Sequence, residues 1–224
     1  KYFPTDKNDL KAIINKRIKE NPKCDLNDVW VGDIVDMRYL FESCKFDSDI
    51  SRWDVSNVED MYAMFYKSTF DADISQWDVS NVDNMGFMFS ESTFNGDISQ
   101  WDVSNVIYMN NMFKKSTFNG DISDWNVSNV TTMIGMFSES IFNGDISDWD
   151  VSSVRDMYAA FKNSTFNGDI SRWDIRNVRD MSWMFSESKF DGDLSKWDVR
   201  NLETMRGMFN NCPLEKHPPK WYNF

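Results

Sequence analysis

The sequence predicts an α/β solenoid, in which the chain winds into stacked coils that each contain one short strand and one short helix. Three observations lead to this prediction. The chain repeats a unit of 24 residues, apolar positions alternate and then follow helical spacing within each unit, and turn-forming residues separate the units. A fixed period of roughly 20 to 50 residues is typical of solenoids, propellers and other repeat arrays.

The repeat is clearest in the aromatic and sulfur-containing residues. Trp recurs every 24 residues from Trp53 to Trp221 without insertion or deletion, and all 14 methionines fall in two columns of the same period. This period suits coils of the leucine-rich-repeat kind, whereas a propeller blade needs about 40 residues. A single coil cannot bury such side chains, so stacked neighbours must do so. We assign to this core Trp77, Trp101, Trp125, Trp149, Met85, Met109, Phe89 and Phe113.

Within one unit, the spacing of apolar residues predicts the local elements. Trp77 and Val79 alternate with polar residues, which is the period of a strand. Asn81 follows and is expected to cap the free amides of a short helix. The Asn-Gly pair at 95–96 predicts a tight turn into the next strand. One face of the helix is formed by Val82, Met85, Met88 and Phe89.

The two ends depart from the repeat, as terminal coils must. Residues 1–28 contain an apolar stripe at helical spacing, opened by Thr5-Asp6 and closed by Asn21-Pro22, which predicts a capping helix and a linker. Residues 29–212 hold about seven and a half repeats, and the proline-rich residues 213–224 form a C-terminal cap. We expect these three parts to form one structural domain.

Composition narrows the classes of partner and compartment. The chain has 36 acidic and 24 basic side chains, a net charge of −12, which argues against nucleic acid because phosphate binding needs a basic surface. No apolar run approaches the roughly 20 residues of a transmembrane helix. The chain starts at Lys1 without a visible signal peptide, so we expect a mature or trimmed chain. We expect Cys24, Cys44 and Cys212 to be free thiols, and we consider a disulfide between Cys24 and Cys44 the less favoured alternative.

The unit D-I-S-x-W-D-V-S-N-V-x-x-M-x-x-M-F, present over about residues 25–212, resembles the repeat of BspA-like surface proteins and mycoplasma-type surface lipoproteins. That family is regarded as a relative of leucine-rich repeats. The resemblance implies a right-handed coil, a bacterial surface or secreted location, and adhesion or binding of a host protein. It carries over no catalytic residues. Leucine-rich repeats place Asn where Val82 stands, so we expect the usual asparagine ladder to be absent there.

The residues themselves also favour a non-catalytic protein without a cofactor. The one histidine, His217, lies in the proline-rich end, so no Ser-His-Asp set can be placed in the repeats. No phosphate-binding loop and no zinc-type Cys/His spacing occurs. Acid–base pairs need unlike environments, whereas the repeated Asp columns offer equivalent ones.

Two columns of Asp leave one question of ligand chemistry open. Like charges about 4.8 Å apart on successive coils repel by nearly 1 kcal/mol even in water. The favoured interpretation is that each carboxylate accepts backbone N–H groups in its own turn. The alternative is a ladder of weak Ca²⁺ sites at Asp97, Asp121, Asp145 and Asp169.

Positions that vary between the copies suggest where a partner binds. Residues 70–150 hold 2 Lys and no Arg against 13 acidic residues, whereas residues 151–208 hold 9 basic and 9 acidic ones. On the predicted strand face the second stretch offers Arg172, Arg176, Lys196, Arg200, Asp174 and Asp198. Outward aromatics could join into an interface patch formed by Tyr62, Tyr108, Tyr158 and Trp183. We expect a protein partner, with a glycan, a self-associating array and a merely solvated surface left as alternatives.

Overall fold

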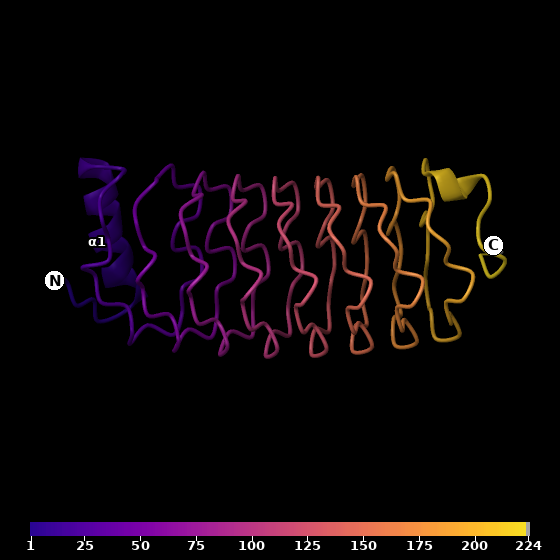
Figure 1. The fold of residues 1–224 in the computed structure, drawn as a ribbon, viewed down its shortest axis with the longest axis horizontal. Coiled ribbons are helices and arrows are strands. Elements are labelled where there is room, and N and C mark those ends of the chain that lie inside the picture. Colours follow the sequence, from indigo (N-terminus) through magenta and orange to yellow (C-terminus); the bar gives the residue numbers. More distant parts are fainter. Residues whose placement is uncertain (223–224) are drawn as a thin grey trace.

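The computed structural model describes residues 1–222 as a row of 24-residue coils with a different segment at each end (Figure 1). Regular helix is confined to the ends: α1 spans Lys7–Glu20 and the short 3-10 helix η1 spans Pro213–Glu215. The coils lie side by side along the long axis of the molecule, and the two chain ends lie at its opposite ends.

Neighbouring coils pair in parallel through residues that lie 24 positions apart. Isolated parallel bridges join Asp36 to Asp60, Asp60 to Asn84, and so on until Asp180 pairs with Thr204. Because each bridge joins equivalent positions of adjacent copies, the register of the coils is the period of the sequence. Within residues 1–222 these bridges do not extend into strands.

The segment predicted to form a short helix is instead a run of overlapping turns. The N–H groups of Phe87 and Phe89 donate to carbonyl oxygens of the next coil at 2.9 and 3.0 Å, whereas the N–H of Met88 donates to Met85, three residues earlier, at 3.2 Å. Donors therefore point alternately along the stack and back into the same coil, so the backbone is satisfied without a helix. The expectation of a helix in each repeat was wrong, although its four apolar positions are buried.

Residues with a left-handed backbone conformation (positive φ) cause this alternation in the direction of the N–H groups. Each coil has two of them, at the positions of Phe87 and Glu91, with φ between 51° and 63°. This conformation interrupts an α-helix and costs about 1–2 kcal/mol for a residue with a Cβ atom. Gly135 and Gly207 avoid that cost, and Asn111, Asn163 and Asn211 bear less of it than the other residue types do. Packing between coils must therefore hold the other residues in place.

The predicted strand around Trp77 is not formed either. The backbone turns there, with N–H groups of Trp77 and Val82 donating to carbonyls three residues earlier. The indole N–H of Trp77 donates to the carbonyl of Ile50 in the preceding coil at 3.1 Å. All the Trp residues of this column, from Trp53 to Trp221, make the equivalent bond at 2.7–3.1 Å. The column thus ties each coil to its predecessor as well as filling the core.

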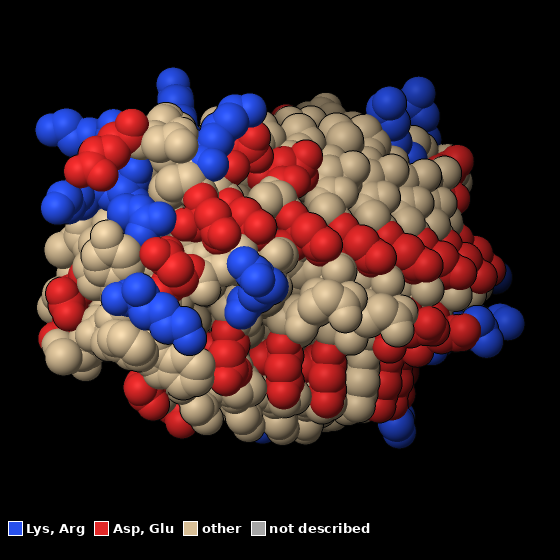
Figure 2. Space-filling view, turned by 60° about the vertical axis from the view of Figure 1, so that its left-hand side comes forward, with Lys and Arg blue, Asp and Glu red and all other residues tan. Residues whose placement is uncertain are grey.

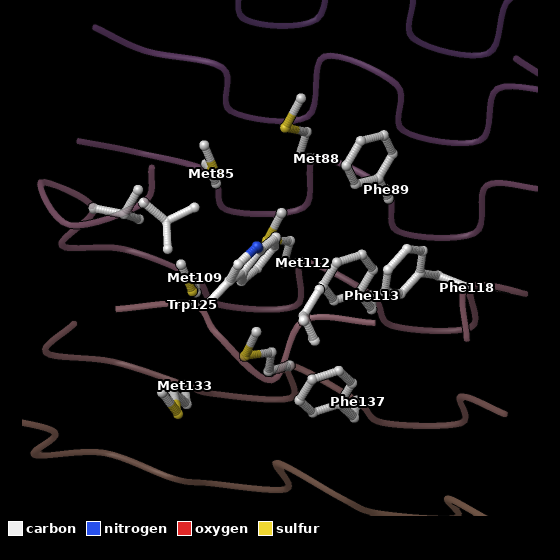
Figure 3. Packing of buried hydrophobic residues seen from close by; sticks show 14 of the residues in the cluster. Met85, Met88, Phe89, Met109, Met112, Phe113, Phe118, Trp125, Met133 and Phe137 are labelled. Carbon is white, nitrogen blue, oxygen red and sulfur yellow. The ribbon is translucent and has the colours of Figure 1, made fainter. Parts of the chain in front are cut away.

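Stacked columns of Phe and Met fill the interior (Figure 3). The rings of Phe89 and Phe113 lie 5.9 Å apart, and those of Phe113 and Phe137 lie 5.7 Å apart, in both cases nearly parallel. The methionines form two further columns beside them, one through Met85, Met109 and Met133 and the other through Met88 and Met112. Every residue assigned to the core from the sequence is at most 4% exposed.

The Asn-Gly pairs do not make the predicted tight turns. Gly96 lies outside any turn and has no left-handed φ, and a Cβ atom there would lie 2.9 Å from the ring of Phe94. Glycine therefore leaves room for the Phe94 ring, although earlier coils accommodate a Cβ atom in the same column at Ser48 and Ala72. The side-chain oxygen of Asn95 accepts the N–H of Asn119 in the next coil at 2.8 Å. This pair is one more link between coils.

The ends are closed by segments of different kinds. The helix α1 begins after Asp6, whose side chain accepts the N–H groups of Asn8 and Asp9. Leu10 and Ile14 of α1 are fully buried against the first coil. At the other end Trp221 continues the Trp column, with its ring 6.4 Å from that of Trp197.

The three cysteines are free thiols in the structure. Cys24 is buried, with its Sγ 3.4 Å from the Oγ of Ser48, so it contributes to packing at the N-terminal end. Burial raises the pKa values of the Cys44 and Cys212 thiols. A bridge between Cys24 and Cys44, the alternative that the sequence left open, is not formed.

Candidate functional site: a polar face with two hollows

Two polar hollows lie on one face of the stack. The N-terminal hollow has a volume of about 690 Å³ and is lined by Asp33, Val35, Asn57, Glu59, Asn81 and Asp83. The C-terminal hollow has a volume of about 820 Å³ and is formed by equivalent positions of later coils, among them Asn129, Thr131, Ser153, Arg155, Asn177 and Arg179. In the coil between them, Asn105 and Ile107 occupy the same positions.

A ladder of backbone hydrogen bonds sets the spacing of the side chains on this face. The N–H of Thr131 donates to Ile107, that of Arg155 to Thr131, and that of Arg179 to Arg155, at 2.8–3.0 Å. Side chains of successive coils therefore project from equivalent points about 4.8 Å apart. This column differs from the core columns because it changes chemistry along the chain, through Val35, Glu59, Asp83, Ile107, Thr131, Arg155, Arg179 and Glu203.

Charge is opposite at the two ends of this face. The N-terminal hollow is lined by three acidic residues, Asp33, Glu59 and Asp83, and by no basic one. The C-terminal hollow is lined by three arginines and one glutamate. Arg179 lies 3.3 Å from Glu203, whereas Arg155 has no ion-pair partner among residues 1–222. An extended ligand would therefore meet opposite potentials at its two ends, which favours one orientation.

A ladder of asparagine side chains forms one wall of the face. The Nδ2 atoms of Asn81 and Asn105 donate to the carbonyls of Ser56 and Ser80 in the preceding coil, each at 2.6 Å. The same bond is made by Asn57, Asn129, Asn177 and Asn201. Asn81 is thus not the helix cap that its position suggested. The asparagine ladder, expected to be missing at Val82, is supplied by the residue before it.

The charged residues predicted for binding lie largely in ion pairs with one another. Arg172 donates to Asp148 of the preceding coil at 2.7 Å, and Arg176 pairs with Asp174. The bidentate hydrogen bonds from Arg200 lower the pKa of Asp198 to about 2. Lys196 is exposed on the same side. Of the predicted basic residues, Arg176 alone lines the C-terminal hollow.

The predicted aromatic residues do not form one patch. Tyr108 and Tyr158 are 46% and 42% exposed, but within residues 1–222 no ring contact joins either of them to another aromatic residue. Tyr62 packs instead against its neighbours, with the rings of Tyr39 and Phe87 at 5.4 and 5.5 Å. The ring of Trp183 contacts two cations, with the Nζ of Lys162 5.7 Å and the Cζ of Arg206 6.0 Å from its centroid.

The Asp columns form acidic rows along the surface, visible in Figure 2. In the turns of Asp97, Asp121, Asp145 and Asp169 the carboxylate accepts the N–H of the serine two residues later, at 2.9–3.0 Å. This bond lowers the pKa of each of the four Asp residues. Hydrogen bonds from backbone N–H groups thus offset the electrostatic repulsion between the Asp carboxylates of successive coils. Residues 1–222 contain no group of three or more acidic, His or Cys side chains that could hold a metal ion.

These turns predict how stability depends on pH. The folded pKa of the Asp column lies below the unfolded value of about 3.9, so its stabilisation is present above that pH and is lost as the pH falls toward the folded value. Burial raises the pKa values of Asp60 and Asp156, so these two residues make the opposite contribution to the pH dependence of stability. They are outnumbered by the Asp residues whose pKa values are lowered. We expect the urea midpoint to be constant from about pH 7 to pH 5 and to fall below about pH 4. A midpoint that rises between pH 4.5 and pH 3 would contradict this account.

A single turn can be tested by substitution. Asp102 accepts the N–H of Ser104 at 3.0 Å, and in the next coil Asn126 accepts the N–H of Ser128 at 3.2 Å. We therefore expect Asp102→Asn to keep its stability within about 0.5 kcal/mol, whereas Asp102→Ala should lose about 0.5–1.5 kcal/mol. Urea unfolding of the two variants side by side measures this. An Asp102→Ala variant as stable as wild type would show that the turn bond contributes nothing.

Comparison with known proteins yields a family rather than a named relative. No curated protein matches the chain, and no solved structure does. No helix within residues 1–222 is long and apolar enough to span a membrane. A family model described as "Mycoplasma protein of unknown function, DUF285" matches residues 9–119, 68–162 and 114–221. These overlapping matches extend over nearly all of the coils. The chain therefore belongs to this mycoplasma-type repeat family.

Proposed function

We propose that the protein is a non-catalytic binding module, a solenoid that engages a protein partner along its polar face. The observation that carries this proposal is the contrast between columns. Trp, Phe and Met repeat almost unchanged from coil to coil, whereas the column through Glu59, Asp83, Arg155 and Arg179 changes charge along the stack. Stacked coils present an extended surface on which several side chains can contact one partner.

The arrangement of charges supports binding rather than catalysis. The acidic and basic ends of the face lie several coils apart, so their side chains cannot act on one reacting bond. His217, the one histidine, lies at the C-terminal end with its Nε2 2.8 Å from Asp191. By its resemblance to BspA-like and mycoplasma surface proteins, we place the module on a bacterial surface or in the secreted fraction. A host protein is then a candidate partner, with a glycan as the alternative ligand.

Charge reversal at the two hollows tests this function. We expect wild-type protein to capture a partner from host-cell or bacterial extracts. The variants Glu59→Lys/Asp83→Lys and Arg155→Glu/Arg179→Glu should each lose it. The matched control is Arg172→Glu, which changes an exposed arginine that lines neither hollow. Capture that is equal for all four proteins would refute binding at this face.

A second candidate function, self-association into a longer array, is favoured by the open edge of the last coil. In earlier coils the N–H groups at these positions donate to the next coil, but those of Met205 and Gly207 have no acceptor among residues 1–222. A hollow of about 310 Å³, bordered by Tyr222, lies beside them. Unpaired edges of this kind can template pairing with another chain. Sedimentation over a range of protein concentrations tests it, and a monomer at every concentration would exclude it.

A further inference from the structure

The asparagine ladder is interrupted once, within the C-terminal hollow. Between Asn57 and Asn201, every other coil has Asn at this position, whereas this coil has Ser153. In the described part of the chain, no hydrogen bond joins the Ser153 side chain to the preceding coil, unlike the side chains of Asn129 and Asn177. The carbonyl oxygen of Ser128, which an asparagine at this position would have engaged, accepts no hydrogen bond from any of residues 1–222. The interruption therefore leaves a notch with a free backbone acceptor.

A cation without a partner lies beside the notch. Arg155 follows Ser153 by two residues and lines the same hollow, and it has no ion-pair partner within the described chain. Arg179 projects from the equivalent point of the next coil, about 4.8 Å along the ladder. It shares its charge with Glu203 at 3.3 Å. Two like charges at this spacing repel each other, and an anion placed between them would relieve the repulsion.

We propose that the notch formed by Ser128, Ser153 and Arg155 binds an acidic peptide segment. This inference rests on the proposed binding function and specifies its ligand. A backbone N–H of the segment donates to the carbonyl of Ser128, and the carboxylate of a neighbouring Asp or Glu pairs with Arg155 and Arg179. Hydrogen bonds between ionised groups of this kind are roughly twice as strong as neutral ones.

The combination of donor and acceptor groups favours a peptide over other anions. Phosphate groups of nucleic acids offer acceptors to the arginines but no donor for the Ser128 carbonyl. The rows of acidic residues along the stack and the net charge of −12 also repel a long polyanion. A short acidic segment avoids this repulsion because it contacts only the basic hollow. The rest of the partner would extend toward Glu59 and Asp83, where basic groups fit.

Restoring the asparagine tests the notch directly. In Ser153→Asn the new amide should donate to Ser128, so this variant should be at least as stable as wild type. It should bind a fluorescein-labelled peptide of alternating Gly and Glu about tenfold more weakly, the factor expected for 1.4 kcal/mol. A second variant, Arg155→Thr, copies the residue at the same position of the preceding coil and should also weaken binding. Fluorescence anisotropy gives the affinities, and thermal unfolding checks the fold.

The matched control opens the same notch where no cation follows it. Asn105→Ser frees the carbonyl of Ser80, but Ile107 lies at the position of Arg155, so this variant should gain no second peptide site. The peptide proposal is wrong if wild type does not bind the acidic peptide, if Ser153→Asn binds it equally well, or if inorganic phosphate displaces it as well as unlabelled peptide does. Continued loss of partner capture on charge reversal would still support the broader binding function in each of those cases.

Discussion

The variant Trp125→Ala is expected to lose about 3–5 kcal/mol of unfolding free energy. Its side chain is 3% exposed, its ring lies 6.5 Å from that of Trp149, and its indole N–H donates to Ile98 at 3.0 Å. Truncation leaves a cavity between two coils in the middle of the stack. It also removes one of the two hydrogen bonds that the Ile98 carbonyl accepts, the other coming from the N–H of Trp101 at 3.2 Å. Each coil is stabilised by its neighbours, so the loss affects both halves of the molecule.

Urea unfolding followed by far-ultraviolet circular dichroism measures this effect. The control variant Trp125→Phe keeps an aromatic ring but removes the indole N–H. It should lose about 0.5–1.5 kcal/mol, the net contribution of one hydrogen bond, because the Ile98 carbonyl still accepts the N–H of Trp101. The order wild type, Phe, Ala tests the two contributions separately. A Phe variant as stable as wild type would show that the hydrogen bonds of the Trp column do not stabilise the stack.

The variant Gly135→Val is expected to lose about 2–4 kcal/mol, because two costs add. Gly135 has a φ of 57°, which a β-branched residue rarely adopts, and its added Cβ atom would lie 2.3 Å from the Oδ1 of Asn111 in the preceding coil. The substitution therefore strains the backbone and displaces a neighbouring side chain.

The next coil provides the control for this prediction. Ala159 lies in the same column with a φ of 54°. The variant Ala159→Gly removes the backbone strain of this conformation, but it also raises the conformational entropy of the unfolded chain, and the two effects oppose each other. We expect its unfolding free energy to stay within about 1 kcal/mol of wild type. If Gly135→Val were as stable as Ala159→Gly, the left-handed column would not be a real feature of the coils.

The sequence predicted well those features that recur every 24 residues. The burial pattern of Trp77, Met85 and Phe89 follows from the period alone, since a residue that must stack on its own copy reappears in every unit. The N-terminal helix was also predictable, because the Asp6 cap and the apolar stripe are local signals.

Local conformation within a coil was not predictable from the same pattern. A helix and a run of turns bury the same positions around Met85 and Phe89, so apolar spacing cannot distinguish them. The left-handed residues that decide between the two include Phe87 and Lys115, whose residue types have no preference for that conformation. Tertiary packing imposes it on them.

The site was only partly visible for a similar reason. An asparagine at the position of Asn81 is equally compatible with a helix cap and with a hydrogen bond to a neighbouring coil. The structure decides between the two, because its acceptor lies in the preceding coil. Arg155 and Arg179 were hidden within the predicted helix. The sequence did contain one signal for this site, the change from Glu59 to Arg179 along one column. The core columns must repeat to keep the coils packed, whereas surface positions can vary and so can serve binding.

The distance between spin labels along one column tests the stacking of coils in register most directly. In a variant whose three cysteines are replaced by alanine, labels are placed at Glu59 and Glu203, or at Asp83 and Arg179. These pairs lie six and four coils apart, so we predict backbone separations of about 29 and 19 Å, a difference of about 10 Å. Equal distances, or distances that do not scale with the number of coils, would contradict the stack and every site built on it.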